Sequence, residues 1–136
     1  MTPRFVLDAW AMLALLQGEE PAASRVKALL AAAGLGEAEL CMSIINLGEV
    51  VYRIGKSQGE EAAWETLDQI RRLSLTVIPA GEEAVWAAVR FKIQFAISYA
   101  DAFAAATAGE LKATLVTGDP ELLALATGIP IERLER

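Results

Sequence analysis

Short apolar stretches alternate with longer segments of helical periodicity along the whole chain, and this alternation constrains the fold more than any other feature. The strands are expected at RFVL (4–7), LCMS (40–43), LTVIP (75–79), TLVT (114–117) and IPIERL (129–134), the last at a sheet edge. One or two helical segments separate each strand from the next. Helical crossovers of this kind are typical of a parallel β-sheet covered on both faces. The sequence therefore predicts an α/β fold.

The ends of the intervening helices carry local signals. Gly18 ends the first helical segment, Pro21 begins the second and Gly34 ends it. Ser98 and Asp101 have the spacing of a capping box at the start of the sixth. The helices are expected at 9–17, 21–33, from 44 onward, 60–73, 82–96, 98–111 and 121–127.

Composition bounds the class of protein. The 136 residues contain no repeat, linker or shift in composition, so a single domain over 1–136 is expected. The longest apolar run, Ala9–Leu16, is too short to span a membrane, and the first residues lack the pattern of a signal peptide. The lone cysteine, Cys41, cannot form an internal disulfide. These features favour a cytoplasmic protein without a membrane partner.

The absence of histidine limits the chemistry. With no histidine and one cysteine, the chain cannot assemble a Ser-His-Asp triad, a Cys-His pair or an ordinary zinc site. An enzyme of this composition must use carboxylates, hydroxyls, lysine, or a hard metal ion bound by oxygen. The net charge of −6 weighs against a nucleic-acid ligand. That objection weakens if several acids bind metal, because twelve Lys and Arg residues remain.

Four acids fall where the predicted topology brings them together. Asp8 ends the first strand and is the only polar residue in FVLDAWAMLALL. Glu49 lies about a turn and a half into the helix that leaves the second strand, and Asp101 lies in the first turn of a helix that returns to the fourth strand. Asp119 follows that fourth strand. All four positions belong to the carboxyl edge of a parallel sheet, where α/β proteins bind ligands.

Each acid also has a purely structural interpretation. Asp8 and Asp101 suit helix N-termini, Glu49 can pair with Arg53 one turn later, and Asp119 suits a turn. Four carboxylates at one edge would nevertheless repel each other unless a cation lay between them. With oxygen ligands alone, Mg²⁺ is the expected ion, and Mn²⁺ is possible. Such a site suits hydrolysis of phosphodiester bonds.

Four blocks of the sequence resemble the PIN-domain ribonucleases, and in particular the VapC-type toxins of toxin–antitoxin pairs. The blocks are FVLDAWAMLALL, SIINLGEVVYRI, ISYADAFAAATAGELKATLVTGDPELL and IPIERL, in the order of the family. The resemblance implies a PIN-like three-layer fold with a parallel sheet in the order 3-2-1-4-5. It also implies a magnesium-dependent endoribonuclease that acts on RNA, forms a homodimer and is inhibited by a cognate antitoxin.

The resemblance also assigns residues. The family's four acids, which are both catalytic and metal-binding, fall on Asp8, Glu49, Asp101 and Asp119. Asn46 and Thr117 match positions that are often polar in the family and orient the ligands. Where many relatives carry an aspartate two residues after the fourth acid, this chain has Glu121, whose role stays open. Trp10 or Trp86 is expected near the contact of the homodimer.

Two alternatives remain from the sequence. One is a metal-binding α/β signalling module of the phosphate-receiver type, although the paired acids and the late lysine of receivers are not evident. The other is a PIN-like domain that has lost its activity and serves only as a binding partner. The presence of all four acids argues against the second alternative.

Overall fold

A five-stranded parallel sheet forms the centre of the protein in a computed structural model that describes residues 2–125 and 128–136. The strands lie in the order β3-β2-β1-β4-β5, and every neighbouring pair is parallel. They are β1 (Arg4–Leu7), β2 (Glu39–Ser43), β3 (Thr76–Ile78), β4 (Thr114–Thr117) and β5 (Ile131–Arg133). The predicted α/β class and the predicted strand order are both confirmed.

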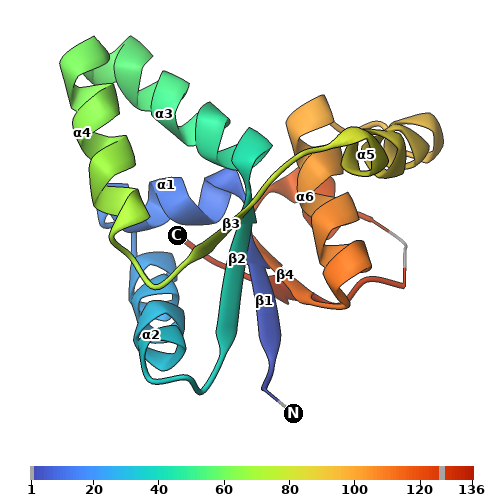
Figure 1. The fold of residues 1–136 in the computed structure, drawn as a ribbon, viewed down its shortest axis with the longest axis horizontal. Coiled ribbons are helices and arrows are strands. Elements are labelled where there is room, and N and C mark those ends of the chain that lie inside the picture. The colour runs from blue at the N-terminus through green and yellow to red at the C-terminus, as the bar shows by residue number, and fades with distance from the viewer. Residues whose placement is uncertain (1, 126–127) are drawn as a thin grey trace.

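Helices cover both faces of the sheet and complete three layers. In Figure 1, α1, α2, α3 and α4 lie on one side of the strands, and α5 and α6 lie on the other. The helices are α1 (Ala9–Gln17), α2 (Ala22–Gly34), α3 (Ile44–Gln58), α4 (Glu60–Arg71), α5 (Glu82–Gln94), α6 (Tyr99–Leu111) and α7 (Pro120–Leu123). None of the helices in the described part of the chain has the length and apolar character needed to cross a membrane.

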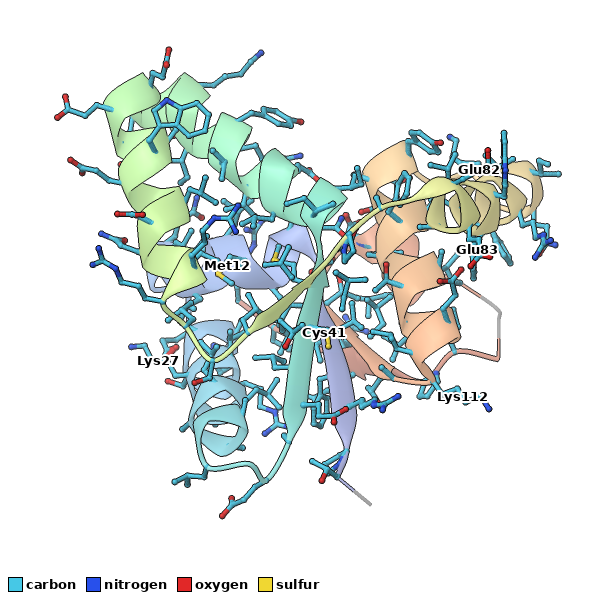
Figure 2. The ribbon with its side chains drawn as sticks, in the orientation of Figure 1. Met12, Lys27, Cys41, Glu82, Glu83 and Lys112 are labelled. Carbon is cyan, nitrogen blue, oxygen red and sulfur yellow. The ribbon has the colours of Figure 1, made fainter. Side chains whose placement is uncertain are left out.

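Successive residues of a strand contribute to the hydrophobic core on opposite faces of the sheet, because side chains of a strand alternate between the two faces. Leu7 and Val116 pack with α1 to α4, whereas their neighbours Val6 and Leu115 pack against α6. This double burial explains why the strands are almost wholly apolar. Figure 2 shows the same division, with the Met12 side chain on the α1 side of the sheet and Cys41 on the α6 side.

The strand order positions the candidate site. From β1 the chain moves outward to β2 and β3, and it then crosses back to place β4 on the other side of β1. Leu7 pairs with Val116, so the carboxyl ends of these two neighbouring strands lie level with each other. The direction of the connections reverses between them, which opens a crevice at this edge.

Some predicted boundaries differ from the observed ones. The seventh helix is one turn long and ends at Leu123, and the remainder of its predicted range includes 126–127, which lie outside the described residues. The fourth helix stops at Arg71, because Arg72 and Leu73 bond to carbonyls only three residues back and close its last turn.

Candidate metal centre

Asp8 caps a helix and is also buried against a neighbouring strand. It is the N-cap of α1, and its Oδ1 accepts a hydrogen bond from the backbone N–H of Ala11 at 2.9 Å. Its Oδ2 accepts a hydrogen bond from the hydroxyl of Thr117 on β4. The residue is 1% exposed. A cap needs neither this burial nor the contact with β4, so capping alone does not account for the position.

Thr117 links the first and the last of the four predicted acids. Its hydroxyl donates to Asp8 and accepts from the backbone N–H of Asp119 at 2.9 Å. Asp119 in turn is the N-cap of α7, where its Oδ1 accepts from the N–H of Glu121 at 2.9 Å. The buried hydroxyl thus fixes the turn after β4 relative to the end of β1.

Asp101 arrives at the same edge from α6. The Ser98 side chain caps this helix by accepting from the N–H of Asp101 at 3.1 Å, as the capping-box spacing predicts. Five alanines between 102 and 108 are buried, so nothing bulky holds the helix away from the sheet. Asn46 of α3 also secures the start of α6, because its Nδ2 donates to the carbonyl of Ala100 at 2.9 Å.

Glu49 faces the same space from α3. Its carboxylate pairs with Arg53 at 2.9 Å, so the ion pair considered from the sequence is formed. Glu49, Asp101 and Asp119 nevertheless line one small cavity of about 150 Å³, together with Arg53 and other residues. Three of the four predicted acids therefore share a cavity, and the fourth, Asp8, is buried beside them.

The electrostatics of this cluster favour a bound cation. Burial raises the pKa of Asp8 to about 7, against the hydrogen bonds from Thr117 and Ala11, and the charges of Asp101 and Asp119 raise it further. Burial also raises the pKa of Asp101 to about 7, and the neighbouring carboxylates of Asp119 and Glu49 add to the shift. A divalent cation would reverse both effects by compensating the negative charge.

A fifth acid joins the cluster. Carboxylate oxygens of Asp101, Asp119 and Glu121 all lie within 4.8 Å of one another. In the sequence, the only signal for Glu121 is its position two residues after the last predicted acid. The donor set consists of oxygen atoms, as Mg²⁺ and Mn²⁺ prefer, and it contains no soft ligand. The residues present therefore fit a hard divalent cation.

The fold and the cluster together define a class: a three-layer α/β protein with an oxygen-donor site at the carboxyl ends of its two central strands. The model of the PIN domain family matches residues 5–128. The chain therefore belongs to the PIN-domain family.

Solved structures of toxin–antitoxin proteins share this fold. A chain of VapBC2 from Rickettsia felis, crystallised with a DNA fragment from its promoter, is 18% identical with a TM-score of 0.76, and the match covers 97% of this chain and 99% of that one. A chain of VapBC-1 from nontypeable Haemophilus influenzae is 22% identical with a TM-score of 0.71, and the match covers 96% of this chain and 97% of that one. VapC20 of Mycobacterium tuberculosis, described as a Sarcin-Ricin loop cleaving toxin, is 17% identical with a TM-score of 0.69. This match covers 88% of this chain and 93% of that one. No curated protein sequence matches significantly.

Proposed function

We propose that this protein is a magnesium-dependent endoribonuclease and the toxin of a type II toxin–antitoxin pair. One observation carries the proposal: Glu49, Asp101 and Asp119 line a single cavity beside the buried Asp8, within a PIN domain. The structural neighbours support RNA as the substrate, because one of them is a toxin that cleaves the sarcin-ricin loop.

In this proposal Asp8, Glu49, Asp101 and Asp119 are both the metal ligands and the catalytic residues. Mg²⁺, or Mn²⁺ in its place, would lower the pKa of a water molecule and compensate charge on the phosphate. The protein contributes positioning. Thr117 holds Asp8 and the turn that carries Asp119, and Ser98 holds the first turn of α6 at Asp101. The raised pKa values of Asp8 and Asp101 mean that a cation must displace protons near neutral pH.

The same proposal includes three further properties. An antitoxin would inhibit the enzyme, since several structural neighbours are toxin–antitoxin complexes. The protein would act in the cytoplasm, where its RNA substrate is made. It would also form a homodimer, for which Trp86 is the better candidate because it is 56% exposed on α5, whereas Trp10 packs against Gly118 near the acids.

The test compares RNA cleavage in cells that express the wild type, Asp101→Asn or Glu83→Gln. Glu83 is the matched control, because it is an exposed acid on α5 (Figure 2). Asp101→Asn should abolish cleavage and growth inhibition, and Glu83→Gln should retain both. Equal cleavage by all three proteins would refute the proposal. A protein that binds Mg²⁺ but cuts no RNA would indicate the non-catalytic alternative.

A further inference from the structure

A second cavity adjoins the acidic one. It has a volume of about 510 Å³ and is lined by residues of α1, of the turn after β4, of α7 and of the C-terminal segment. Trp10 and Arg136 line both cavities, so the two lie side by side. The larger cavity, here called the Trp10 groove, also includes Pro120, Leu123 and Arg133. A polymer bound across the acids would therefore extend into this groove.

The indole ring of Trp10 packs closely against Gly118 at the junction. A Cβ atom added to Gly118 would lie 2.3–2.6 Å from three carbon atoms of the ring, so only glycine allows this approach. The guanidinium carbon of Arg136 lies 5.0 Å from the ring centroid, which is a cation–π distance. The junction thus presents an aromatic ring and a positive charge beside the acids.

The two arginines of the groove are free to change partners. Arg136 pairs with Glu19 at 3.2 Å, and Arg133 pairs with Glu135 at 3.0 Å. In both pairs the arginine side chain is at least half exposed, and such surface pairs contribute little free energy. A phosphate offers guanidinium groups a stronger, bidentate partner. Within the Trp10 groove, Arg133 and Arg136 are the lining residues that offer guanidinium groups to a phosphate.

We propose that the Trp10 groove is a nucleotide subsite for the RNA strand next to the cleaved phosphodiester. Arg136 leaves the ring of Trp10 and binds a backbone phosphate together with Arg133. A base then takes its place on the ring, since aromatic side chains stack with single-stranded bases in this way. The proposal rests on the proposed ribonuclease function and adds to it the residues that hold the substrate outside the metal centre.

The experiment measures RNA binding without cleavage. A short, fluorescently labelled oligoribonucleotide of mixed sequence is titrated with the Asp101→Asn protein in EDTA, over a range of salt concentrations. Arg136→Gln and Trp10→Ala are added to this parent, and Arg90→Gln, an exposed arginine on α5, is the matched control. We expect Arg136→Gln and Trp10→Ala each to weaken binding about tenfold. Arg136→Gln should also reduce the salt slope by about 0.7, the value for one lost contact to single-stranded nucleic acid.

A second measurement does not depend on replacing Trp10. Trp64→Phe and Trp86→Phe remove two tryptophans that are each 56% exposed, so Trp10 is the single tryptophan left in the sequence. RNA should quench this fluorescence, because a stacked base contacts the ring.

The possible outcomes separate the two proposals. If the parent binds RNA but neither groove variant weakens binding and Trp10 is not quenched, the subsite is refuted and the ribonuclease proposal stands. The subsite is also refuted if Arg90→Gln weakens binding as much as Arg136→Gln, because the effect is then one of general charge. If the wild type neither binds nor cuts RNA, both proposals fail.

Discussion

Asp8→Asn should remove the pH dependence that Asp8 imposes on stability in the absence of metal. In the folded protein the pKa of Asp8 is raised from 3.8 to about 7, mainly by burial. Between these two values the folded state holds a proton that the unfolded state has released. Stability from this group is therefore fully present near pH 4 and is lost as the pH rises toward 7 and above.

The magnitude follows from the size of the shift. At about 1.4 kcal/mol per pKa unit, a shift of roughly three units removes about 4 kcal/mol from the free energy of unfolding. Asparagine carries no charge and avoids this loss. It keeps an oxygen that can accept from Ala11, but Thr117 loses its carboxylate acceptor, at a cost of about 1 kcal/mol. The variant should thus be less stable than the wild type by about 1 kcal/mol near pH 4, and more stable by about 3 kcal/mol near pH 8.

Urea unfolding in EDTA, followed by circular dichroism from about pH 4 to pH 8, measures this difference directly. Glu83→Gln serves as the control and should follow the wild type at every pH, because Glu83 is exposed. A difference between wild type and Asp8→Asn that stays constant with pH would refute the reasoning. The Asp8 carboxyl would then not be desolvated, and the case for a buried acid that needs a cation would lose its basis.

Three further predictions concern the same edge of the sheet. Thr117→Val should destabilise the protein by about 2–4 kcal/mol in urea unfolding, because it removes both the buried donor to Asp8 and the acceptor for the N–H of Asp119. Thr107→Val is the control: it loses one hydrogen bond within a helix and should cost about 1 kcal/mol. Gly118→Ala should lower the stability by about 1–3 kcal/mol in thermal unfolding, because the new methyl group clashes with the ring of Trp10. A smaller residue in place of Trp10 should relieve this loss, so a double mutant whose loss equals the sum of the two single losses would contradict the clash. Millimolar Mg²⁺ or Mn²⁺ should raise the melting temperature and release protons near pH 7, and Asp8→Asn should diminish both effects; a wild-type protein unaffected by either ion would contradict the metal centre.

The pattern of the sequence was sufficient for the fold because its signals are local. Strand and helix periods, Gly18, Ser98 and the apolar surroundings of Asp8 each act over a few residues, and the parallel topology then places the acids at one edge. The strand order itself came from resemblance to a family.

The details of the site depend on contacts that no local pattern encodes. Trp10 reads as an ordinary apolar residue of a helix, yet it contacts Gly118 and Arg136, which are more than a hundred residues away. Glu121 lies beside Asp101 because the first turn of α7, which Asp119 caps, approaches α6, and no local pattern in the sequence indicates this approach. Such contacts are set by the directions of side chains after the elements have packed.

The hydrogen bond between Thr117 and Asp8 joins residues 109 positions apart, and this distance determines when the site can exist during synthesis. Translation delivers β1 first, and one edge of this central strand stays without its partner until β4 leaves the ribosome. Asp8 is therefore among the first residues made, whereas Thr117 and Asp119 are among the later ones. A nascent or interrupted chain that lacks β4 lacks the complete cluster, so under the proposed ribonuclease function it would not cut RNA until most of the chain has been made.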